Sequence, residues 1–192
     1  MKHWRLEYYA CLQTAALYHG ASHQKPQVFQ IMTNKQINPL SIGKIRIEFI
    51  YKKSLDGLPT QNIAVKSGYL KISSPELTAI DLLLYPDHSG GLNHIATVLS
   101  ELIEAIDHKK LIALAKLIKE KAWLQRLGFL LDHIDSMVED KKKLIVSHVQ
   151  KELESQKLFY IPLATELATK GCPRNKKWMI IENTSIESDN DT

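Results

Sequence analysis

The chain has 192 residues and a net charge of +4, and its 44% hydrophobic and 24% charged residues are ordinary values for a folded globular protein. No apolar run approaches the roughly 20 residues of a membrane span, and residues 1–5 lack the features of a signal peptide. The two cysteines lie far apart and form no CxxC pair, so the sequence predicts a cytoplasmic protein with no disulfide and no membrane contact.

The first third of the chain predicts one helix and a small sheet. Apolar positions recur at helical spacing between Glu7 and Gly20, which predicts a leading helix that ends at the glycine. Residues 38–43 contain Asn, Pro and Gly and predict a loop. Short apolar or alternating segments between such turn formers predict strands, and these are expected at residues 27–33, 44–52, 62–66 and 69–72.

The pattern becomes helical at residues 73–76, which read Ser-Ser-Pro-Glu. This is a typical helix start because a serine oxygen can accept from a free N–H, proline fits the first turn, and a carboxylate favours the positive helix end. The first helix is expected to end at Pro86. Further helices are expected at residues 92–106, 109–120 with a continuation over 122–131, and 141–154.

The last element is a strand, at residues 177–183, and we expect it to return to the sheet. Strands followed by helices and a closing strand predict an α+β fold with a four- or five-stranded sheet backed by a helical bundle. Within one compact domain, residues 1–73 would supply the basic helix and sheet portion. Residues 74–184 would supply the bundle and the returning strand, and residues 185–192 a polar tail.

Motifs of catalytic and metal sites are absent from the sequence. His19 and His23 have i,i+4 spacing, but Gly20 and Ser22 lie between them, where the helix is expected to end. The sequence contains no HExxH, GxSxG, P-loop or GxGxxG motif. We therefore expect no metal, no cofactor and no catalytic residue that the sequence alone can identify.

Three features are candidates for a site linked to function or to a partner. Asp81 lies inside an otherwise apolar helix, where burial would require a bond to Arg126 or to a backbone amide. Arg126 is the only basic residue of the segment 123–131. Lys177 and Trp178 place a cation beside an indole. Each feature also has a structural alternative, namely a paired core charge or a strand edge guarded by lysine.

Positive charge is concentrated in the first third. Residues 1–73 carry ten Lys and Arg against three Asp and Glu, a net of +7, whereas residues 74–192 carry fifteen against eighteen, a net of −3. This asymmetry favours contact with phosphates or with an acidic partner, but strands with one solvated face also carry lysines. The candidates for phosphate contact are Lys44, Arg46, Lys52 and Lys53.

Five segments in order along the chain resemble the AbiEi antitoxins of type IV toxin–antitoxin systems. They are residues 8–30, 73–82, 90–102 and 125–132, and the closing set Trp178, Asn183, Glu187 and Asp189. The likeness covers nearly the whole chain. It implies a non-enzymatic antitoxin that antagonises a nucleotidyltransferase-like toxin in abortive infection.

The same resemblance implies a transcriptional regulator, since antitoxins of this family repress their own operon through an N-terminal winged helix-turn-helix. The likeness begins at Tyr8, and the residues before it are too few for a recognition helix, so we expect this chain to lack that module. Two alternatives stay open: a nucleic-acid-binding module that uses the basic first third on the DNA phosphate backbone, and an enzyme acting on the toxin or on a nucleotide through Asp81 and Arg126.

Overall fold

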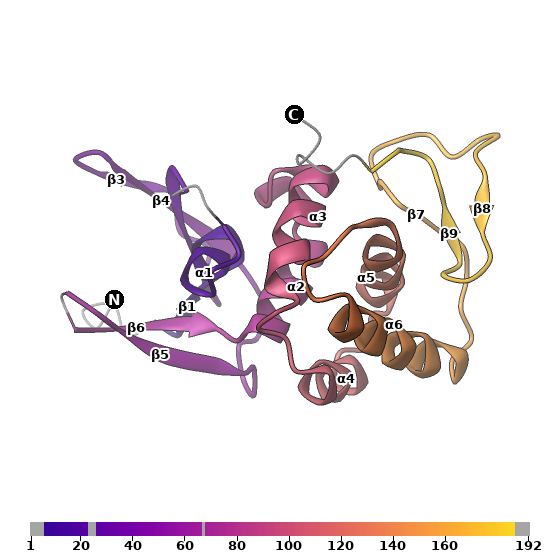
Figure 1. Ribbon diagram of the computed structural model, residues 1–192. Coiled ribbons are helices and arrows are strands. Elements are labelled where there is room, and N and C mark those ends of the chain that lie inside the picture. The colour runs from indigo at the N-terminus through magenta and orange to yellow at the C-terminus, as the bar shows by residue number, and fades with distance from the viewer. Residues whose placement is uncertain (1–5, 23–25, 67, 187–192) are drawn as a thin grey trace.

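The computed structural model describes residues 6–22, 26–66 and 68–186, which form a large sheet, a layer of helices and a second small sheet (Figure 1). The large sheet has the spatial order β3-β4-β2-β1-β6-β5. Its strands are β1 (Tyr8–Ala10), β2 (Val28–Thr33), β3 (Leu40–Ile42), β4 (Ile45–Tyr51), β5 (Thr60–Val65) and β6 (Gly68–Ser73). The hairpins β3–β4 and β5–β6 form its two edges and project away from the helices, with helix α1 (Leu12–Tyr18) between them.

The helices follow β6. They are α2 (Pro75–Leu84), the 3-10 turn η2 (Pro86–His88), α3 (Gly91–Leu102), α4 (His108–Leu117), α5 (Ala122–His133) and α6 (Glu139–Glu154). Helix α2 is central, because it packs against α1, α3, α4 and α5, and eight of its ten residues are buried. The boundary expected near residue 74 falls between β6 and α2. None of the described helices is long and apolar enough to cross a membrane.

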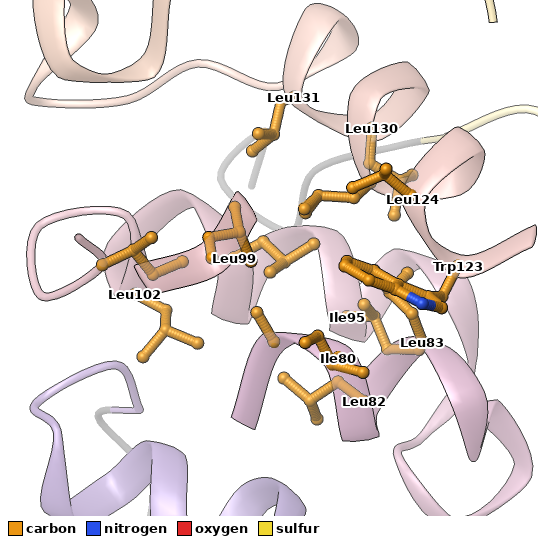
Figure 2. Packing of buried hydrophobic residues seen from close by; sticks show 14 of the residues in the cluster. Ile80, Leu82, Leu83, Ile95, Leu99, Leu102, Trp123, Leu124, Leu130 and Leu131 are labelled. Atoms are coloured by element: carbon orange, nitrogen blue, oxygen red, sulfur yellow. The ribbon is translucent and has the colours of Figure 1, made fainter. Parts of the chain in front are cut away.

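One buried apolar cluster connects the sheet to the helices. The register pairs Tyr9 with Met32 and Met32 with Ile50, so these three side chains share the sheet face that belongs to this cluster. The helices contribute the rest of the cluster. Figure 2 shows Trp123 of α5 pointing toward Ile95 of α3 and Leu83 of α2.

The first element differs from the helix predicted over residues 7–20. Tyr8–Ala10 forms strand β1, and the helix begins only at Leu12, whose φ of 50° turns the chain sharply. The backbone N–H of Cys11 still donates to the carbonyl of Gln30 in the neighbouring strand. A short buried strand that leads into a helix buries nearly every position, so helical spacing alone misassigned residues 8–10.

The α+β class is confirmed, but the closing strand does not return to the large sheet. Strand β9 (Ile180–Ile181) lies between β7 (Ile161–Pro162) and β8 (Arg174–Asn175) in a separate sheet, at the opposite end of the helical layer (Figure 1). The large sheet has six described strands rather than four or five. The additional edge strand is β3, in the segment predicted as a loop, because it pairs antiparallel with β4 across the turn at Gly43.

Candidate functional site

Asp81 joins the sheet to the helical layer. The side chain of Asp81 is fully buried in α2. The hydroxyl of Tyr9 in β1 donates to Oδ2 of Asp81 at 2.8 Å, and Nζ of Lys52, just after β4, donates to Oδ1 at 2.6 Å. Each carboxylate oxygen therefore has a partner from a different strand or strand end, and the three side chains form what we call the Asp81 network.

The expected partner of Asp81 was Arg126 or a backbone amide, and this expectation is wrong. Lys52 takes that place because β4 runs alongside β2 and ends beside α2, which brings two residues 29 positions apart within bonding distance. Nothing in the local sequence of either residue encodes this approach. The sequence analysis assigned Lys52 to phosphate contact, whereas the structure commits its ammonium group to Asp81.

Burial dominates the electrostatics of this network. Burial raises the pKa of Asp81 above its usual value, although Lys52 and the hydrogen bond from Tyr9 act in the opposite direction. Burial first, and Asp81 second, raise the pKa of Tyr9 well above its ordinary range. The buried thiol of Cys11 nearby has a raised pKa for the same two reasons. The network thus holds a neutral phenol beside one ion pair, and the neutral thiol of Cys11 lies near it.

The geometry of the network favours a structural role. Asp81 has no exposed surface, and both of its oxygens are already hydrogen-bonded. A substrate would have to displace Tyr9 or Lys52 to reach it. In this chain the network links α2 to β1 and to the end of β4, so its contacts set how the helix sits against the sheet.

The start of α2 carries a second polar connection. The hydroxyl of Ser74 accepts from the backbone N–H of Leu77 at 3.3 Å and donates to Glu76 at 2.8 Å. The other oxygen of Glu76 accepts from the backbone N–H of Asp107 at 2.9 Å, just before α4. The predicted helix start is therefore present, with Ser74 as the cap, and Glu76 also ties α2 to α4.

Arg126 belongs to a different part of the molecule. Its guanidinium donates to the backbone carbonyls of Pro162 at 3.0 Å and Leu163 at 3.1 Å. Partial burial lowers its pKa, since desolvation disfavours the charged form. The predicted pair of Asp81 and Arg126 therefore does not form one site, because each has its own separate partners.

Gln125, the neighbour of Arg126, was not a predicted site residue. Its side-chain amide is within hydrogen-bonding distance of the carbonyls of Phe159, Trp178 and Met179, at 3.1 to 3.2 Å. Gln125 and Arg126 thus hold the small sheet against α5 by its backbone. The available sequence signal for this contact was a glutamine within a largely apolar segment, and the structure buries its side chain.

Lys177 and Trp178 meet on one acid of α5. The indole N–H of Trp178 donates to Oδ2 of Asp132 at 2.7 Å, and Nζ of Lys177 donates to the same oxygen at 2.6 Å. The Lys177 ammonium also lies 4.9 Å from the centre of the Trp178 ring. The indole is fully buried, whereas Lys177 is partly exposed. The pair thus connects the turn between β8 and β9 to α5, and its role toward a partner stays a prediction.

The four predicted phosphate contacts do not form one patch. Lys44 lies in the turn of the β3–β4 hairpin and Arg46 follows in β4, and both are exposed. Lys53 is exposed beyond the other end of β4, on the order of 20 Å from Arg46 at about 3.3 Å per residue. Lys52 is paired with Asp81. Phosphate binding by Lys44, Arg46 and Lys53 stays a prediction.

Within the described residues, no cluster of three or more His, Cys, Asp or Glu side chains has the arrangement of a metal site. The predicted spacing of His19 and His23 falls partly outside the described residues. His19 itself bonds through Nε2 to the carbonyl of Ser73 at 2.8 Å, in a contact between the end of α1 and the end of β6.

Comparison with known proteins identifies a family whose model matches this chain. The model of the AbiEi antitoxin C-terminal domain matches residues 8–133. No curated protein matches the chain significantly. Among solved structures, the RV2827C protein from Mycobacterium tuberculosis is similar, with a TM-score of 0.64 and 13% sequence identity over 94% of this chain and 64% of that one. At this identity the likeness shows the fold alone, and this chain spans less than two thirds of that protein.

The family match coincides with structural boundaries. It begins at the first residue of β1 and ends at the last residue of α5, so it contains the large sheet, the Asp81 network and Arg126. Helix α6 and the small sheet with Lys177 and Trp178 lie outside it. The chain therefore belongs to the family of the AbiEi antitoxin C-terminal domain.

Proposed function

We propose that this chain is the antitoxin of a type IV toxin–antitoxin pair and that it antagonises a nucleotidyltransferase-like toxin. The observation that carries the proposal is the family match from β1 to α5. The segment is a continuous unit, because the Asp81 network and the shared apolar cluster tie its sheet to its helices. An antitoxin of this kind acts as a regulatory protein in the cytoplasm.

The buried network supports antagonism by a surface rather than by catalysis. Asp81 and Arg126 are engaged with separate partners, so the enzyme alternative lacks an open pair of reactive groups. The exposed β3–β4 hairpin projects from the body (Figure 1) and presents Lys44 and Arg46 to an acidic partner or to phosphates. Antitoxicity would therefore depend on exposed residues and tolerate conservative changes in the network.

The test is co-expression of this chain with the nucleotidyltransferase-like toxin that the proposal assigns to it. Growth should be restored by this chain and not by an empty vector, and a toxin without catalytic activity should control for the burden of expression. A pull-down of the tagged chain then separates direct contact with the toxin from antagonism through a shared target. Growth arrest that persists while the chain is folded and abundant would exclude the antitoxin role.

A second candidate function is contact with the DNA phosphate backbone, as part of transcriptional regulation. The observation that favours it is the exposed Lys44 and Arg46 on the hairpin, in a third of the chain with a net charge of +7. Binding to operator DNA should weaken steeply as salt rises. An absence of binding at low salt would rule out this function.

A further inference from the structure

A polar cavity of about 350 Å³ opens beside the large sheet, and none of its described lining residues belongs to the Asp81 network. Residues from five elements line it. Those with polar side chains that the argument uses are Gln13 of α1, Gln30 of β2, Glu48 of β4, Asp87 and His88 of η2, and His94 of α3. No sequence motif pointed to this cavity, because its residues are scattered over 82 positions of the chain.

Gln30 fixes the position of the cavity's main acid. It is only 5% exposed, and its amide nitrogen donates to Oε2 of Glu48 at 3.3 Å and to the carbonyl of His88 at 2.6 Å. The amide oxygen of Gln30 accepts from the backbone N–H of Gln13 at 3.2 Å. Both the nitrogen and the oxygen of this buried amide are therefore hydrogen-bonded, and the nitrogen holds Glu48 and η2 in place.

Glu48 in turn orients the imidazole of His88. Nδ1 of His88 lies 3.0 Å from Oε1 of Glu48, and because a carboxylate only accepts, Nδ1 carries the proton. In the neutral ring this leaves Nε2 as an acceptor. The carboxylate of Glu48 and the ring of His88 are 29% and 41% exposed, so both remain accessible from the cavity.

The rest of the described lining adds side chains that can accept hydrogen bonds and no Lys or Arg. The side chains of Gln13, Asp87 and His94 make no hydrogen bond to the part of the chain that the structure describes, and all three line the cavity. Two carboxylates, from Glu48 and Asp87, face the cavity without a Lys or Arg among its described lining residues. A group that offers several N–H donors and a positive charge satisfies such a lining.

We infer that the Glu48–His88 cavity binds a guanidinium or alkylammonium group. Glu48 and Asp87 supply the opposite charge, and Gln13, His88 and His94 supply further acceptors. The group can come from a free amine or from an arginine side chain of a protein. This inference rests on the cavity alone, so it can fail or hold independently of the antitoxin function.

The test uses two probes of the same shape that differ in charge, butylguanidinium and butylurea. Titration of the ¹⁵N-labelled chain should shift the amide signals of Gln13, Gln30 and His88 with butylguanidinium, with butylurea binding at least about tenfold more weakly. Glu48→Gln and Asp87→Asn should each weaken butylguanidinium binding by about tenfold or more. Asp140→Asn, on the exposed side of α6, is the matched control and should leave the binding unchanged.

Glu48→Gln keeps the size of the side chain, and the exposed Asp87→Asn variant gives the same reading if Glu48→Gln disturbs folding. Equal responses to the two probes, no response, or equal losses in Asp87→Asn and Asp140→Asn would overturn the inference. Agmatine and a blocked Ala-Arg-Ala peptide then identify the source. Preference for agmatine indicates a free amine, and equal or tighter binding of the peptide indicates a protein side chain.

Discussion

The indole of Trp178 occupies the space that a side chain at residue 128 would need. A Cβ on Gly128 would overlap three atoms of the six-membered indole ring, so the glycine allows α5 and the turn between β8 and β9 to approach closely. The indole N–H is also bonded to Asp132, one turn further along α5. This explains why a glycine stands in the middle of α5.

Gly128→Ala should destabilise the protein by about 1–3 kcal/mol, because the added methyl group overpacks a filled space. This is opposite to the usual gain of up to about 1 kcal/mol for this change in a helix. Urea unfolding followed by circular dichroism measures the difference. The same change in a Trp178→Leu background should cost less, since the smaller side chain leaves room. A variant as stable as the unchanged chain would disprove the contact.

Lys52→Ala should destabilise the protein by about 3–5 kcal/mol, because among the described residues it leaves the buried Asp81 bonded to Tyr9 alone. Asp81 must then keep an unpaired charge or take up a proton, and both options cost free energy. Lys53→Ala is the matched control, since its side chain is exposed, and it should change stability by less than about 0.5 kcal/mol. Equal effects in urea unfolding would refute the structural role of the ion pair.

Stability should fall as the pH decreases below about 6.5, and His19 should account for part of the loss. Burial lowers the pKa of His19 in the folded protein, although the bond to Ser73 partly opposes this. The unfolded chain therefore binds more protons than the folded chain between the two pKa values, so the contribution is present above the unfolded value and lost as the pH falls. Urea unfolding at pH 7.5 and 5.5 should show a smaller change in His19→Gln. An identical change in both proteins contradicts the prediction.

Charge reversal on the hairpin, Lys44→Glu with Arg46→Glu, should lower affinity for operator DNA by about tenfold or more without changing stability. The slope of log affinity against log salt should decrease by about two, if both residues contact phosphates. Fluorescence anisotropy at several salt concentrations measures both quantities. Lys151→Glu, on the exposed face of α6, serves as the control. A loss of the same size in this control would assign the effect to net charge.

The sequence was most informative where the local pattern determines structure. Alternation of charged and bulky residues predicted β4, although burial does not follow this alternation, because the buried Ile50 shares a face with Arg46 and Glu48. The Ser-Ser-Pro-Glu segment predicted the start of α2, where Ser74 caps the helix. Both signals depend on neighbouring residues only, and a single sequence contains them.

Pairings between distant segments were not predictable in the same way. Lys52 and Asp81 were both singled out, but for different roles, since nothing local indicates that the end of β4 meets the middle of α2. The predicted position of β9 was wrong for the same reason, because a two-residue strand carries no signal of which sheet it joins. For the candidate site, the expected contact between Asp81 and Arg126 was wrong, and the functional role of the named residues stays a prediction.

The docking of the small sheet on α5 has a consequence for how the two parts can change over time. Gln125 and Arg126 donate hydrogen bonds to the main-chain carbonyls of residues 159, 162, 163, 178 and 179. Every amino acid has such a carbonyl. Much of this attachment therefore does not depend on which side chains the small sheet carries. Outward-facing residues of the C-terminal segment can thus be substituted while its hydrogen bonds to α5 are kept.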